Sequence, residues 1–207
     1  MSQRKHLDTL LEIKENPSTN QRTLARKLNI SLGLTNAILK NLVFRGWVKA
    51  KKDTGRKLLY IITPKGMANV SSLMYKRFQE TFHYYHYTKD LISTYLMTLY
   101  KKGVRTVNIY GINQLTEITY YAGISTPLKL NAIITDDLSK EKYLGHSIIS
   151  IDKFLSQYSD NNNISNQKIT ILSTVNSEEL NRKLEKYKRI KNHIKIINIE
   201  NLLTQSK

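Results

Sequence analysis

Apolar positions in the first third of the chain recur every three or four residues, in three short runs separated by polar breaks. This periodicity predicts amphipathic helices over residues 3–15, 19–28 and 31–45. Ser18 precedes Gln21 by three residues, which is the spacing of a capping box and predicts the start of the second helix. The side chains expected to face inward on the second and third helices are Leu24, Ala25, Leu28, Thr35, Ile38, Leu39 and Leu42.

Two strand-like runs follow the third helix. Residues 47–51 and 57–62 predict two strands joined by the turn Asp53-Thr-Gly-Arg56, which forms a basic hairpin. Helix, short helix, turn, helix and hairpin is the order of a winged helix-turn-helix, whose recognition helix lies in the DNA major groove. The pattern therefore predicts an α+β winged helix-turn-helix domain over residues 1–66.

The middle of the chain predicts a long helical segment over residues 67–102. It holds no proline or glycine, and it forms either one helix or two helices broken near residues 81–88. A helix of this length exceeds the needs of one domain and suits packing against a second copy, so we expect a homodimer that reads a palindromic site. The apolar residues at helical spacing in its first half are Met67, Val70, Met74 and Phe78.

An aromatic stretch over residues 81–87 lies inside this segment. Its two histidines, His83 and His86, are three residues apart on one helix face, which is a spacing that metal sites use. No third ligand is evident nearby, so no metal site is predicted. The stretch is interpreted as an aromatic dimer or interdomain seam, with ligand stacking as the alternative.

Residues 103–207 alternate between apolar strands and amphipathic helices. Strands that alternate with helices indicate a mostly parallel sheet, here a small α/β Rossmann-like domain. The first strand ends at a single glycine in the stretch VNIYGINQLTEI, residues 107–118. The expected strands are 104–110, 128–135, 147–150, 168–174 and 194–199, and the expected helices are 112–122, 151–157 and 177–191.

Charge is distributed unevenly along the chain. Its formal net charge is +17, and residues 1–70 carry 14 Lys and Arg against 4 Asp and Glu, whereas residues 104–207 carry 14 against 10. A basic first domain beside a nearly balanced second one indicates a polyanionic partner for the first domain only. The chain has no cysteine, which excludes disulfides, thiolate metal sites and cysteine nucleophiles.

The first domain resembles the DNA-binding domain of MarR-type winged-helix regulators, in particular variants associated with surface-polysaccharide gene clusters. The resemblance covers about residues 5–68 and implies double-stranded DNA as partner, with the exposed side of the third helix reading base edges. It is carried by Thr23-Leu-Ala25, Asn29-Ile-Ser31, Leu39, Leu42, Arg45-Gly-Trp-Val48, the basic hairpin and Thr63-Pro-Lys-Gly66. The base-reading positions that it implies are Gly33, Leu34, Asn36, Ala37 and Lys40.

The residue types at these positions favour an A·T-rich site. Asn36 suits an adenine edge, and Leu34 and Ala37 suit thymine methyl groups. Much of the affinity is expected from the phosphate backbone. The residues expected to contact phosphates are Arg22, Ser31, Lys40, Lys51, Arg56 and Lys57.

Residues 104–155 resemble the nucleotide-binding N-terminal domain of sugar acyltransferases that modify amino-sugar nucleotides. Gly111 matches the first glycine of the phosphate-binding turn, while Asn113 and Thr116 stand at its second and third glycine positions. The resemblance implies a cofactor site formed by Gly111, Asn113, Gln114 and Asp136. Three interpretations stay open: a dinucleotide site, a site for a phosphate or sugar nucleotide at the helix start, and a structural domain with no cofactor.

No catalytic motif is found in the sequence: there is no G-x-S-x-G, H-E-x-x-H or P-loop pattern. There is also no bilayer-length apolar run, so no membrane partner is expected and a cytoplasmic protein is predicted. The favoured function is a dimeric, non-enzymatic transcription regulator, open to a small-molecule effector. The alternatives are a nucleotide- or sugar-nucleotide-dependent enzyme or sensor with a DNA-binding appendage, and a non-catalytic protein-interaction adaptor.

Overall fold

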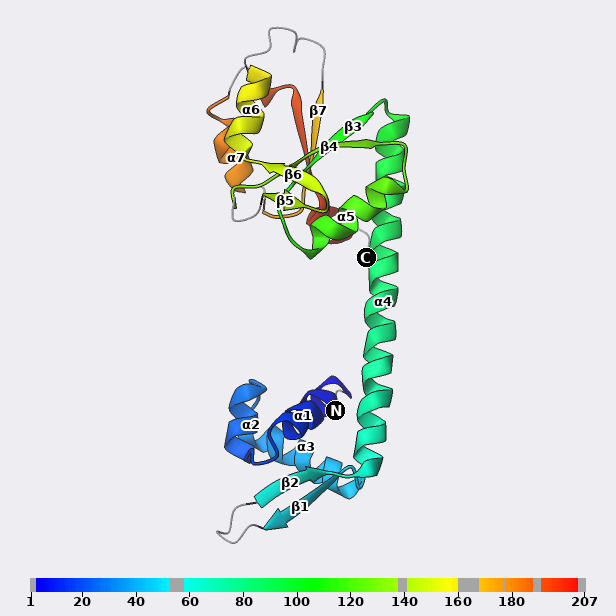
Figure 1. The fold of residues 1–207 in the computed structure, drawn as a ribbon, viewed down its shortest axis with the longest axis vertical. Coiled ribbons are helices and arrows are strands. Elements are labelled where there is room, and N and C mark those ends of the chain that lie inside the picture. Colours follow the sequence, from blue (N-terminus) through cyan, green and yellow to red (C-terminus); the bar gives the residue numbers. More distant parts are fainter. Residues whose placement is uncertain are drawn as a thin grey trace. The chain divides into compact units, whose positions relative to one another are not determined.

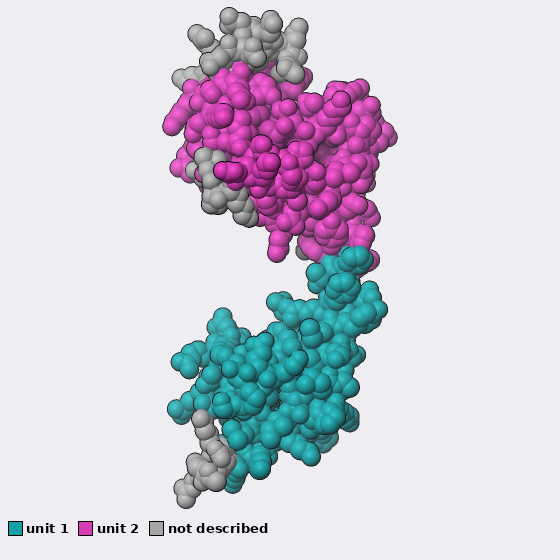
Figure 2. All heavy atoms as spheres, in the orientation of Figure 1, with its two compact units in different colours: residues 1–82 teal, residues 83–207 magenta. Residues whose placement is uncertain are grey.

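The computed structural model describes residues 3–52, 58–137, 141–159, 168–176, 178–187 and 191–204. The chain divides into two compact units, residues 1–82 and 83–207, and the division falls inside the helix α4 (Pro64–Lys101) (Figures 1 and 2). The three-part division into residues 1–66, 67–102 and 103–207 stays a prediction. Among the described residues, no helix combines the length and the apolar character that crossing a bilayer requires.

The first unit begins with three helices and a two-stranded antiparallel hairpin, as predicted. Their packed faces form one apolar core, in which Leu24, Ile38 and Leu42 are fully buried. Ala25 and Leu28, which were predicted to face inward, are only partly buried. The elements are α1 (Gln3–Glu15), α2 (Gln21–Lys27), α3 (Leu32–Phe44), β1 (Val48–Lys52) and β2 (Leu58–Ile62).

The start of α2 differs from the prediction. Asn20, not Ser18, is the N-cap, because its extended backbone lets Oδ1 accept a hydrogen bond from the Thr23 N–H at 2.9 Å. The predicted capping box between Ser18 and Gln21 is therefore wrong. At α3 the N-cap is Ser31, whose Oγ accepts from the backbone N–H of Leu34 at 3.2 Å.

The helix α4 runs without a break from Pro64 to Lys101, so the alternative of two helices is wrong. Its first turn packs closely on the hairpin: a Cβ on Gly66 would lie 2.0 Å from the carbonyl oxygen of Trp47, so only glycine fits there. Val70 joins the core of the first unit, whereas Ile92, Leu96 and Leu99 join a core of the second unit.

The second unit is built on a six-stranded sheet in the order β5-β6-β4-β3-β7-β8, in which every pairing except β5 with β6 is parallel. The mostly parallel sheet is thus confirmed. The short strand β5 was not predicted. The strands are β3 (Thr106–Tyr110), β4 (Lys129–Ile134), β5 (Lys142–Tyr143), β6 (His146–Ile149), β7 (Ile169–Ser173) and β8 (Ile194–Asn198).

Helices cover both faces of this sheet, which is why its interior strand β7 is buried along its whole length. One apolar core joins the sheet to the end of α4 and to α5, and a second joins it to α6 and α7 (Figure 1). The helix α7 is shorter than the predicted helix over 177–191, and α9 was not predicted. The helices are α5 (Gln114–Ile124), α6 (Ile151–Ser159), α7 (Glu178–Leu184) and α9 (Ile199–Thr204).

Candidate functional site

The exposed side of α3 presents three of the five predicted base-reading positions together. Gly33, Ala37 and Lys40 are exposed and lie four and three residues apart, so they share one face of the helix. The space around Gly33 is open, since a Cβ there would meet no atom within 4 Å. Leu34 instead packs partly against the core of the first unit.

Asn36 turns toward the protein. It lines a groove of about 460 Å³ between α3 and the hairpin, and its Oδ1 is buried there without a hydrogen-bond partner. Phe44, at the end of α3, also lines this groove and is 91% exposed. A bidentate pair between Asn36 and an adenine therefore requires its amide to rotate outward.

The helix-turn-helix corner is basic. Arg22, Arg26, Asn29 and Ser31 line a shallow, open depression where α3 begins, and all four residues are exposed. The N-terminus of a 13-residue helix favours an anion at this position. Arg26 was not among the predicted contacts. Its spacing of four residues from Arg22 is the signal that could have indicated it.

The hairpin strand β1 adds a second row of cations. Lys49, Lys51 and Lys52 are exposed along it, while Val48 is buried. Lys51, one of the three hairpin residues predicted to contact phosphates, is therefore accessible to a partner. Arg56 and Lys57 lie outside the described residues.

A buried histidine joins α1 to the end of α3. His6 is 7% exposed, and its ring lies edge-on to Trp47 with ring centroids 6.5 Å apart. Burial lowers the pKa of His6 below its ordinary value, and the nearby Arg45 guanidinium lowers it further. Arg45 stacks 5.0 Å above the Trp47 ring and donates from Nε to Asn41 Oδ1 at 2.8 Å. This cluster supports the base of the hairpin.

The second candidate site is the turn between β3 and α5. Gly111 has a φ of 112°, and a Cβ on it would lie 2.7 Å from Thr174 Oγ1, so glycine is required here. Thr174 follows β7, which lies next to β3 in the sheet. The chain order of the strands reverses between β3 and β7, and open α/β sheets bind ligands at such a point.

Asn113 and Thr116 close this turn with their own hydrogen bonds. Asn113 Oδ1 accepts from the Thr116 N–H at 2.9 Å, and the Asn113 N–H donates to Thr116 Oγ1 at 3.2 Å. Asn113 Nδ2 donates to the Thr174 carbonyl oxygen at 2.8 Å. Two backbone donors at the start of α5 are thus already used inside the protein. A phosphate bound in the usual pose would compete with these bonds.

A carboxylate and a phenol lie beside the same helix start. The Tyr143 hydroxyl is 3.0 Å from Glu117 Oε1 and 3.2 Å from the Asn113 carbonyl oxygen. Burial, followed by the hydrogen bond to Glu117, raises the pKa of Tyr143 to about 12. The phenol therefore keeps its proton, and the Glu117 carboxylate disfavours an anion at this end of α5. Gln114 is exposed.

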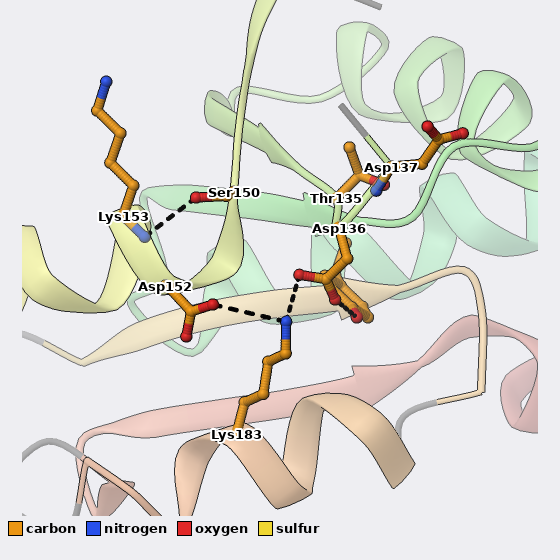
Figure 3. A network of polar contacts seen from close by, with 8 residues as sticks. Thr135, Asp136, Asp137, Ser150, Asp152, Lys153 and Lys183 are labelled. Carbon is orange, nitrogen blue, oxygen red and sulfur yellow. Dashed lines mark hydrogen bonds and ion pairs between the residues drawn. The ribbon is translucent and has the colours of Figure 1, made fainter. Parts of the chain in front are cut away.

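Asp136, the remaining predicted cofactor residue, is held by two side chains (Figure 3). Tyr110 donates its hydroxyl to Asp136 Oδ2 at 2.8 Å, and Lys183 Nζ lies 2.5 Å from Asp136 Oδ1. Lys183 also lies 3.7 Å from Asp152 Oδ2. A ribose hydroxyl would have to displace Lys183 to reach this carboxylate. Across the described residues, no three His, Asp or Glu side chains are grouped as a metal site would need.

Comparison with known protein families gives a match within the first domain. Residues 3–49 match the family described as winged helix-turn-helix DNA-binding. No curated protein sequence matches the chain.

The chain also has structural similarity to three solved regulators. A MarR family transcription regulator has 16% identity and a TM-score of 0.37, over 58% of this chain and 72% of that one. A MarR protein from Peptoclostridium difficile has the same identity and TM-score, over 58% and 74%. The zinc-dependent MarR family regulator AdcR in its Zn(II)-bound state has 19% identity and a TM-score of 0.33, over 49% and 76%.

Proposed function

We propose that the protein is a transcription regulator that binds double-stranded DNA through its first unit. The observation that carries the proposal is the exposed face of α3, set between a basic helix-turn-helix corner and a basic strand, within a segment that matches a DNA-binding family. Gly33, Ala37 and Lys40 enter the major groove, and Asn36 turns outward to join them. The phosphate contacts are Arg22, Arg26, Ser31, Lys51, Arg56 and Lys57.

The regulator acts as a homodimer that is joined through α4. Four large apolar side chains on this helix, Met67, Met74, Phe78 and Phe82, are between 41% and 60% exposed. They fall along one side of the helix, and the Phe78 and Phe82 rings stack with centroids 5.6 Å apart. An apolar stripe of this kind, formed by residues of one unit, suits burial against the same stripe of a second copy.

The second unit is a Rossmann-like regulatory or scaffolding domain. Its strand order and Gly111 support a relationship to nucleotide-binding folds. The hydrogen bonds of Asn113 and Thr116 favour the interpretation without a dinucleotide. A small-molecule effector and a cytoplasmic location belong to the same proposal.

Binding to duplex DNA at two salt concentrations tests the function. The full chain is titrated into 30-base-pair duplexes of mixed sequence, and Lys40→Glu and Arg22→Glu are compared with Lys65→Glu, an exposed lysine at the start of α4. We expect the first two variants to weaken binding by at least tenfold and Lys65→Glu to bind like the parent. Absence of binding at low salt contradicts the proposal, because phosphate contacts are strongest there.

A further inference from the structure

The second unit separates its charges between the two edges of its sheet. Strands β4, β3, β7 and β8 are adjacent and parallel, so their amino ends meet at one edge and their carboxyl ends at the other. The near balance of charge in residues 104–207 is therefore the total of two edges that can differ in charge.

Basic residues stand at or shortly before the start of each of these four strands, with Lys191 three residues before β8. Lys129 opens β4 opposite Thr106 of β3, and Arg105 and Lys168 directly precede β3 and β7. Two backbone hydrogen bonds, from Lys129 to Arg105 and from Ile169 to His193, hold these strand starts side by side at 3.0 and 2.8 Å. The exposed basic residues of this edge, here called the basic edge, are Lys101, Lys102, Arg105, Lys129, Lys168 and Lys191.

Few of these cations are neutralised. Lys191 pairs with Glu185, but no ion pair joins Lys101, Lys102, Lys129 or Lys168 to a carboxylate of the described residues. Arg105 is fixed in place: its guanidinium lies 4.3 Å above the Tyr100 ring and donates to the carbonyl oxygens of Tyr100 and Val104. The basic edge thus carries a concentrated and partly preorganised positive charge.

The carboxyl edge has the opposite character. Asp136 and Asp137 follow β4, Glu117 lies in the first turn of α5, and Glu178 begins α7. Lys183 near this edge is paired with Asp136 and Asp152. The exposed Lys153 in the first turn of α6 adds a further cation here, but the acidic side chains outnumber the lysines at this edge (Figure 3). A general surplus of lysine would make both edges basic, so this difference points to a partner for the basic edge.

We propose that the basic edge binds the phosphate backbone of duplex DNA, as a second contact beside that of the winged helix. Four neighbouring strands span about 14 Å at the usual strand spacing. A duplex presents roughly eight phosphate charges over that length. The lysines of this edge are point charges on flexible side chains, and the Arg105 guanidinium already donates to protein carbonyl oxygens, so the contact is independent of sequence. The choice of duplex DNA over other polyanions rests on the proposed function of the first unit: DNA bound by one unit is at a raised effective concentration for the other unit of the same chain.

The salt dependence of DNA binding by the full chain tests this. Lys129→Glu/Lys168→Glu removes two cations of the basic edge, and Lys142→Glu/Lys153→Glu makes the same charge change at exposed lysines away from it. We expect the first pair to lower the slope of log K against log salt by about 2, at about 0.9 per lost phosphate contact. Between 50 and 200 mM salt, the parent should then lose about tenfold more affinity than the Lys129→Glu/Lys168→Glu variant. The control pair should keep the parental slope.

The outcomes separate this proposal from that of the first unit. If both pairs give the same slope while Lys40→Glu weakens binding, the basic edge does not bind DNA and the winged-helix function stands. If Lys40→Glu changes nothing while the edge variant loses slope, the basic edge binds and the proposed function of the first unit is contradicted. Vesicles containing phosphatidylserine are the third arm: loss of vesicle binding in the edge variant, with an unchanged DNA slope, assigns the edge to membranes and overturns the proposal.

Discussion

Asn113 and Thr116 cap the start of α5 for each other: each backbone N–H donates to the other residue's side-chain oxygen, at 3.2 and 2.9 Å. These two residues stand where a dinucleotide-binding turn has its second and third glycines. The side chains that replace the glycines therefore occupy part of the space and the hydrogen-bonding capacity that a pyrophosphate would use.

The first prediction concerns the stability of this cap. Asn113→Ala removes the acceptor for the Thr116 N–H and the donor to Thr174, and should destabilise the second unit by about 1 kcal/mol. Hydrogen exchange of residues 114–124 measures the local effect. Gln114→Ala is the matched control, since Gln114 is exposed and makes no side-chain hydrogen bond among those that the structure records. Equal protection in the two variants would contradict the role of the cap.

The second prediction concerns nucleotides. Because the turn is closed internally, NAD, NADP, UDP-sugars and nucleoside phosphates should leave the melting temperature of the parent unchanged. A ligand at 100 times its dissociation constant would stabilise the protein by about 2.7 kcal/mol, which a thermal-shift assay detects. Stabilisation of the parent by any of them would support the enzyme or sensor alternative. If nucleotides stabilise only the Asn113→Gly variant, the second unit is a nucleotide-binding fold whose turn is closed by the Asn113 side chain.

The third prediction concerns the pH dependence of the first unit. The folded unit holds the pKa of His6 below its ordinary value of 6.5, so the unfolded chain takes up the proton first as the pH falls. The contribution of His6 to the unfolding free energy should be constant above about pH 6.5. It should decline below that pH, until His6 is protonated in the folded state as well. Urea unfolding followed by the fluorescence of Trp47, the chain's one tryptophan, measures it.

His6→Leu should remove this part of the pH dependence, whereas His83→Gln, a change at an exposed histidine, should retain it. A parental decline that survives in His6→Leu would assign it to other groups.

The fourth prediction concerns Gly66. Gly66→Ala places a Cβ 2.0 Å from a backbone oxygen, so the first turn of α4 or the hairpin must move. We expect a loss of about 3 kcal/mol in the unfolding free energy reported by Trp47. Gly33→Ala is the matched control. The space around Gly33 is open and alanine favours a helix, so this variant should stabilise the unit by up to about 1 kcal/mol. A neutral Gly66→Ala would mean that this packing is dispensable.

The fifth prediction concerns the dimer. Phe78→Asp puts a charge in the apolar stripe of α4 and should shift the protein from dimer to monomer in analytical ultracentrifugation. Ser72→Asp adds the same charge at an exposed position away from that stripe and should leave the dimer intact. A parent that sediments as a monomer at micromolar concentration contradicts this part of the proposal.

Much of the fold follows from local pattern. Short-range periodicity was enough for the three helices, the hairpin and the alternating strands and helices of residues 103–204, because each depends on residues close in sequence. Element ends were less predictable. Asn20 and Ser18 are both good caps, and the choice between them depends on how the chain leaves α1. The β5 strand pairs two residues only and leaves little periodic signal.

The candidate sites divide in the same way. Gly33, Ala37 and Lys40 were named from the resemblance to MarR-type regulators, and their helical spacing agrees with one exposed face. The inward turn of Asn36 depends instead on the groove between α3 and the hairpin. Asp136 was visible as a strand-end carboxylate. Its partner Lys183 lies 47 residues away in sequence, so only the folded sheet brings the two together.

The sequence by itself determined the type of most elements, the basic character of the first domain and the departure of Asn113 and Thr116 from the glycine pattern. Tertiary structure alone decided that these two residues cap each other, that α4 exposes an apolar stripe, and that lysines scattered over residues 101–191 meet at one edge of a sheet. The physical reason is parallel strand pairing: it aligns the starts of strands that are far apart in the chain, so a charge balance that looks even along the sequence becomes two opposite surfaces in space.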